Sequence, residues 1–146
     1  MGFPEPEGGL VISYSYLWRQ EAEAGVVEGR KNRPCAIVLV TRRDEGGTAT
    51  VTVAPITHRL PRDPSVAVEI PPAVKRHLRL DSGRSWIILD DFNVFSWPGF
   101  DLVPVPGTTG EYKYGLLPPR LFRTIIEKFA ELRRQRRITS TPRDEA

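Results

Sequence analysis

The sequence of residues 31–58, KNRPCAIVLVTRRDEGGTATVTVAPITH, decides the fold. It holds two runs rich in β-branched residues, 35–41 and 48–54, which are typical of strands. The six residues between them end in Gly46-Gly47, and paired glycines accept the positive φ angles of a hairpin turn. We therefore predict that the two runs are antiparallel neighbours, with polar side chains at the rim of their sheet.

Further strands are predicted on both sides of this hairpin. Each is a short run of β-branched, aromatic or other apolar residues bounded by turn residues, and they cover 10–17, 65–70, 86–89 and 92–95. Residues 71–78 open with two prolines and predict a helical turn. Residues 97–107 are interrupted by prolines and predict a loop, and no structure is assigned to the rest of 96–117.

The C-terminal part changes to a helical period. From Pro118 onward, apolar residues recur at spacings of three and four and predict one face of a helix: Leu121, Phe122, Ile125, Ile126, Phe129 and Leu132. Residues 138–146 are predicted to form a flexible tail. About five short strands followed by a helix predict a mainly β (α+β) fold, a small barrel with helices packed outside.

Length and composition favour one soluble domain. The chain has 146 residues, of which 40% are hydrophobic and 27% charged, and we expect a single domain over 1–146 with its core at about 8–132. No apolar run reaches the length of about 18 residues that spans a membrane, and the first residues do not resemble a signal peptide. We expect a cytoplasmic protein without membrane contact. The net charge of only +3 means that nucleic-acid binding must depend on local patches.

The chain is poor in soft metal ligands. Cys35 is the single cysteine and lies in an apolar run, so we expect a buried, unreactive thiol. His58 and His77 are the only histidines, too few for a zinc site of the usual kind. We expect neither a metal nor another cofactor.

Polar residues at the rim of the hairpin suit chemistry on a phosphodiester. RNA carries its own nucleophile, the 2′-hydroxyl, so a metal-free ribonuclease needs a base, an acid and positive charge at the phosphate. Arg33 can donate two hydrogen bonds to phosphate oxygens while it stays charged. Thr57 can hydrogen-bond the phosphate, and His58 can move a proton. Alternation along a strand would separate these two side chains unless the chain turns there.

Other polar residues are candidates for binding RNA. Asp90 and Asp91 could be taken as a metal pair, but adjacent carboxylates on a strand diverge. We favour the interpretation that they hydrogen-bond unpaired bases together with Asn93, because sequence-specific RNA recognition targets exposed base edges. The residues around the hairpin rim expected to contact RNA are Glu28, Lys31, Asn32 and Arg59.

Four short motifs, in this order, resemble the PemK/MazF family of toxins from bacterial type II toxin–antitoxin systems. They are Gly9-Leu-Val-Ile12, Arg33-Pro34, Ala54-Pro-Ile-Thr57 and Leu89-Asp90. The resemblance implies an Src-homology-3-like barrel of the MazF/CcdB type with a C-terminal helix, and a homodimer. It also implies metal-independent, sequence-specific cleavage of single-stranded RNA and a cognate antitoxin that masks the RNA groove. The family's catalytic arginine and threonine fall on Arg33 and Thr57, and its loop glutamate on Glu28.

The sequence departs from the family pattern at three positions, Leu10, His58 and Asp91. The RNA sequence that is cleaved therefore cannot be transferred from relatives. Two alternative functions share the fold: a barrel that binds RNA or a peptide without cutting, and a CcdB-like poison of DNA gyrase. Retention of Arg33 and Thr57 favours the ribonuclease. In a homodimer, Tyr14, Tyr16 and Trp18 are candidates for the interface or the core.

Overall fold

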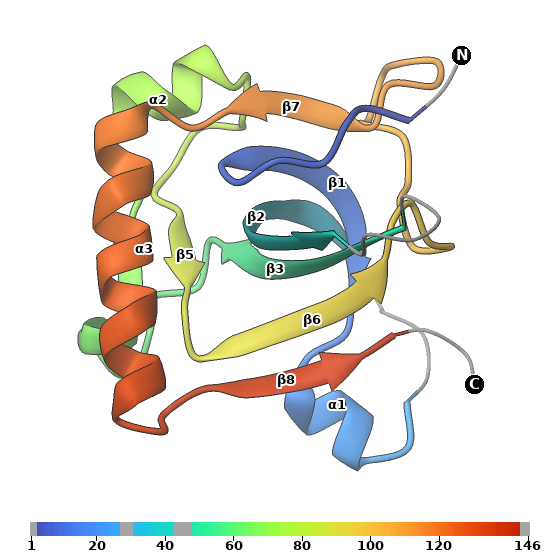
Figure 1. Ribbon diagram of the computed structural model, residues 1–146. Coiled ribbons are helices and arrows are strands. Elements are labelled where there is room, and N and C mark those ends of the chain that lie inside the picture. Colours follow the sequence, from blue (N-terminus) through green and yellow to red (C-terminus); the bar gives the residue numbers. More distant parts are fainter. Residues whose placement is uncertain (1–2, 27–30, 43–47, 144–146) are drawn as a thin grey trace.

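The computed structural model describes residues 3–26, 31–42 and 48–143, and Figure 1 shows their arrangement. Glu28 and the Gly46-Gly47 turn lie outside the described residues. The strands are β1 (Leu10–Tyr16), β2 (Lys31–Arg42), β3 (Ala49–Thr57), β4 (Ala67–Glu69), β5 (Trp86–Ile88), β6 (Asp91–Ser96), β7 (Lys113–Leu116) and β8 (Thr139–Pro142). The helices are α1 (Arg19–Glu23), η1 (Pro64–Val66, a 3₁₀ turn), α2 (Pro72–His77) and α3 (Pro119–Arg134).

The strands form one curled sheet, antiparallel except for one pairing. Its main path runs β4-β5-β3-β2-β1-β7, and β6 pairs with β3 on one side and with β8 on the other. The predicted hairpin is confirmed, because β2 pairs antiparallel with β3 from Cys35 opposite Pro55 to Arg42 opposite Ala49. The fold is therefore mainly β with a C-terminal helix, as predicted, and α3 stands against one side of the curled sheet (Figure 1).

Two hydrophobic clusters fill the two faces of the sheet. One lies under α3, where Ile125, Phe129 and Leu132 are buried against Phe92 and other sheet residues. This confirms the apolar stripe predicted for the helix. The other lies on the opposite face of the sheet and is built on Tyr14, which stacks on Phe95 with ring centroids 4.8 Å apart. Tyr14 and Tyr16 are both buried in the chain's own core, so neither supplies a dimer interface.

The predicted flexible tail is wrong for residues 139–142. They form β8, which pairs parallel with β6 from Asp91 opposite Thr139 to Val94 opposite Pro142. The next side chain, Arg143, is only 3% exposed and makes an ion pair of 2.9 Å with Asp101. Hydrogen bonds and a buried charge order this part of the chain. Such interactions produce no periodic pattern of apolar residues, so no sign of the strand is visible in the sequence.

Three further elements were not predicted. The 3₁₀ turn η1 takes up the start of the strand predicted over 65–70, and only Ala67–Glu69 form that strand. Helix α1 lies in the polar stretch after β1, and β7 lies in the unassigned segment, where it pairs with β1 at the edge of the sheet. Across the described residues, no helix is both long and apolar enough to cross a membrane.

Candidate active site

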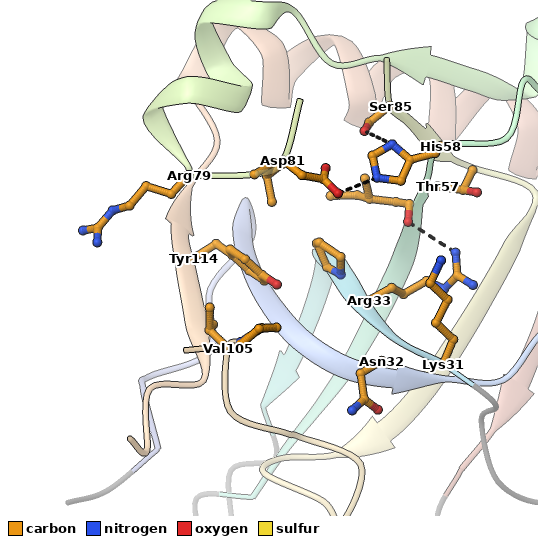
Figure 2. A pocket seen from close by; sticks show the side chains of 14 residues that line it. Lys31, Asn32, Arg33, Thr57, His58, Arg79, Asp81, Ser85, Val105 and Tyr114 are labelled. Carbon is orange, nitrogen blue, oxygen red and sulfur yellow. Dashed lines mark hydrogen bonds and ion pairs between the residues drawn. The ribbon is translucent and has the colours of Figure 1, made fainter. Parts of the chain in front are cut away.

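A pocket of about 420 Å³ opens where β2 begins and β3 ends. It gathers the hairpin-rim residues with side chains from the α2–β5 turn and from the segment around β7 (Figure 2). The lining residues are Lys31, Asn32, Arg33, Pro34, Ile56, Thr57, His58, Arg79, Leu80, Asp81, Ser85, Val105, Pro106 and Tyr114. The pocket therefore brings together all three residues that the sequence nominated for catalysis.

The pairing of β2 with β3 explains why Arg33 and Thr57 meet. Cys35 lies opposite Pro55, and successive side chains of a strand alternate between its two faces. Extending this register by two residues sets Arg33 across from Thr57 on the same face. The two residues are 24 positions apart in the chain, and their proximity follows from the hairpin.

Arg33 is half-buried and held at its head group. Its Nη1 donates to the Ile56 carbonyl oxygen at 3.5 Å, and the guanidinium lies over the Trp18 ring, 5.2 Å from the ring centroid. Its Nε is buried and has no hydrogen-bond partner among the described residues. Because Nε is shielded, the outer N–H groups of the guanidinium are the donors that can reach an anionic oxygen.

Thr57 and His58 both line the pocket because the chain bends at residues 58–59 and the strand alternation ends. The Arg59 amide donates to the Thr57 hydroxyl oxygen at 3.1 Å, which leaves the hydroxyl hydrogen free to donate. His58 Nδ1 lies 3.0 Å from the Arg84 carbonyl oxygen, and Nε2 lies 2.9 Å from Asp81 Oδ2. Both partners are hydrogen-bond acceptors, so a ring nitrogen that carries a hydrogen can donate it to either one.

The opposite wall of the pocket is apolar and aromatic. It consists of Leu80, Val105, Pro106 and Tyr114, and Figure 2 shows Tyr114 and Val105 across the pocket from Arg33 and Lys31. Burial raises the pKa of the Tyr114 hydroxyl, so the ring stays neutral at physiological pH. Three of these residues come from the segment 96–117, which the sequence left unassigned.

Asn93, Asp91 and Asp90 do not line the pocket, so the structure does not support their predicted contact with bases. Asn93 is fully buried, accepts from the Leu17 amide at 2.9 Å and donates to the Leu17 carbonyl at 2.7 Å. Asp91 accepts from the Tyr16 hydroxyl and from the Arg19 amide, and burial raises the pKa of its carboxyl. The side chains of Asn93 and Asp91 hold the end of β1 against β6.

The remaining predicted residues fall into three groups. Lys31 and Asn32 line the pocket, Arg59 is exposed beside it, and Glu28 lies outside the described residues.

Burial raises the pKa of the Cys35 thiol, which agrees with the unreactive cysteine predicted. Across residues 3–26, 31–42 and 48–143, no group of three His, Cys, Asp or Glu side chains could hold a metal ion.

Sequence reasoning missed Arg79, Asp81 and Ser85 of the α2–β5 turn. Arg79 adopts a φ of 56°, unusual for a residue other than glycine, and its side chain points away from the other labelled residues in Figure 2. Ser85 Oγ lies 3.2 Å from His58 Nδ1, but the residue is 2% exposed and accepts from Lys75. A buried hydroxyl that accepts from an ammonium group is a poor nucleophile, so Ser85, His58 and Asp81 do not form a serine-hydrolase triad.

Comparison with known proteins adds nothing to this geometry. No protein family, curated protein or solved structure matches the chain.

Proposed function

We propose that the protein is a metal-independent endoribonuclease that cleaves single-stranded RNA, a toxin of the PemK/MazF kind with a barrel of the MazF/CcdB type. The observation that supports this proposal is the convergence of Arg33, Thr57 and His58 in one pocket at neighbouring strand ends. Cation, hydroxyl and imidazole are the groups needed to cleave a phosphodiester with the RNA 2′-hydroxyl as nucleophile. The family resemblance supports the same proposal, since two of its four motifs contain Arg33 and Thr57.

In the proposed reaction, the 2′-oxygen attacks the adjacent phosphorus and the bond from phosphorus to the 5′-oxygen breaks. The 2′-hydroxyl proton passes to water, and the leaving 5′-oxygen takes a proton from His58, which water then restores. Arg33 balances the negative charge that grows on the phosphate oxygens, a contribution of about 10²–10³-fold in comparable sites. Thr57 donates a hydrogen bond to one of these oxygens.

The two unlike walls of the pocket fit one unpaired nucleotide. The phosphate lies against Arg33 and Lys31, and the base lies against Tyr114 and the apolar residues beside it. Stacking of a base on an aromatic side chain is worth about 1–3 kcal/mol and requires an unstacked base. This arrangement favours single-stranded over double-stranded RNA.

Cleavage should persist in excess chelator, and the products should carry a 2′,3′-cyclic phosphate and a 5′-hydroxyl. The reason is that the substrate hydroxyl is the nucleophile and that the Asp91 carboxylate is already bonded to Tyr16 and Arg19. Mass spectrometry of the fragments from a defined RNA measures the end groups. Activity that is lost in chelator and restored by magnesium would contradict the mechanism.

Thr57→Val should lower the cleavage rate constant at saturating RNA by about 10-fold or more and change the KM less. The substitution keeps the shape of the side chain and removes a hydrogen bond that strengthens as charge develops on the phosphate. Because Arg33 serves the same transition state, the double variant with Arg33→Ala should lose less than the product of the two single effects. Fully multiplicative effects would show that the two residues act separately.

The proposal includes a homodimer and a cognate antitoxin, as the family resemblance implies. Light scattering at micromolar concentration should give about twice the chain mass of 16.5 kDa. A single species at the chain mass would contradict the dimer. A small antitoxin gene next to the toxin gene would support the antitoxin, whereas gyrase inhibition without RNA cleavage would favour the CcdB-like alternative.

A further inference from the structure

Asp81 bridges two cations at the edge of the pocket. Its Oδ2 lies 2.9 Å from His58 Nε2, and its Oδ1 lies 3.6 Å from the ammonium group of Lys75. The carboxylate is 71% exposed and lines the pocket, so it meets any ligand that reaches His58. An acidic side chain in a pocket for a polyanion opposes binding, and its presence calls for another explanation.

Lys75 is a fixed, buried charge behind this carboxylate. Its side chain is only 6% exposed, and the ammonium group donates to the Gly83 carbonyl at 2.6 Å and to Ser85 Oγ at 2.8 Å. A buried ammonium group requires a compensating anion, and Asp81 is the carboxylate that reaches it. Lys75 therefore holds Asp81 next to His58.

The far side of the imidazole ring is held by the same turn. Nδ1 lies 3.0 Å from the Arg84 carbonyl and 3.2 Å from Ser85 Oγ. Backbone on one side and a carboxylate on the other leave the ring a single orientation, with Nε2 facing the pocket side where Asp81 lies (Figure 2). A carboxylate that accepts a hydrogen bond from one ring nitrogen fixes the orientation of the imidazole.

We propose that Asp81, anchored by Lys75, is a positioning residue that holds the His58 ring in one orientation at the pocket. This inference rests on the proposed ribonuclease only for its kinetic consequence. The orientation of the ring and its hydrogen bond to Asp81 can be tested without any substrate.

The test compares Asp81→Asn with the parent and with Glu5→Gln, a matched control whose carboxylate pairs with Arg42 on the exposed surface. All three carry His77→Gln, so that His58 is the only histidine and its ring nitrogens can be read directly by ¹⁵N NMR. In the parent and the control, the Nε2 signal should show the hydrogen bond to the Asp81 carboxylate. Asp81→Asn should shift that signal, with an unchanged thermal melt.

The same variants are then assayed on a defined single-stranded RNA. Asp81→Asn should lower kcat by about 10- to 10²-fold, which is less than the loss of about 10²–10⁴-fold expected when a general acid itself is removed. KM should stay equal or fall, because the substitution removes a negative charge from the pocket. Asp81→Glu should recover part of the loss.

Ring nitrogens that are the same in Asp81→Asn and the parent would overturn the inference, whether or not the chain cleaves RNA. A changed spectrum with an unchanged kcat would overturn it as well. A parent that binds but does not cleave RNA would overturn the proposed function, and the ring spectra would still decide whether Asp81 positions His58.

Discussion

Arg33→Ala should reduce RNA cleavage by about 10²-fold or more, with a smaller loss of RNA affinity. The guanidinium is held at the pocket by the Ile56 carbonyl and the Trp18 ring, and its removal takes away the charge proposed to face the phosphate. The core barely changes, because Arg33 is only half-buried at the start of β2. Single-turnover cleavage, with the protein in excess over labelled RNA and its concentration varied, separates the rate constant from binding.

Arg42→Ala is the matched control for this experiment. Arg42 ends the same strand, carries the same charge and makes an exposed ion pair with Glu5. Its loss should leave cleavage within about 2-fold, because exposed pairs contribute little and the residue does not line the pocket. If Arg33→Ala melts like the parent and cleaves at the parent rate, the active site lies elsewhere.

Arg143→Ala should lower the free energy of unfolding by about 3 kcal/mol, because it breaks a buried ion pair with Asp101. The value is at the low end of the usual range because the Asp101 side chain is partly exposed to water. The guanidinium also donates to the Ser15 carbonyl at 2.7 Å and to Asn93 Oδ1 at 2.8 Å, and it lies over the Tyr14 ring. The melting temperature should fall by about 6–12 °C, as measured by circular dichroism.

Arg134→Ala provides the comparison on the exposed end of α3 and should change stability by less than about 0.5 kcal/mol. The contrary result is that the two variants melt within about 1–2 °C of each other, which corresponds to a difference of about 0.5 kcal/mol or less in the free energy of unfolding. That result would mean that the Arg143 ion pair and the C-terminal strand add little to the stability of the fold. Loss of the native circular dichroism signal at low temperature would show a larger effect than expected.

The sequence by itself determined the hairpin, the C-terminal helix and the meeting of Arg33 with Thr57. Each follows from local physics: alternation and a glycine turn set the hairpin, and a period of three to four sets the face of α3. Because the register of a hairpin is set by its own turn and pattern, the rim residues of β2 and β3 could be predicted to lie together.

Only the tertiary structure decided the apolar wall of the pocket, the contact of Asp81 with His58 and the place of the acidic motif. Tyr114 reaches the pocket through the pairing of β7 with β1, about a hundred residues apart, which no local period records. Asn93 and Asp91 have side chains typical of a binding site, yet they satisfy backbone groups at the end of β1. Whether a polar side chain faces a ligand or its own backbone depends on contacts between distant segments, because burial is a property of the packed chain.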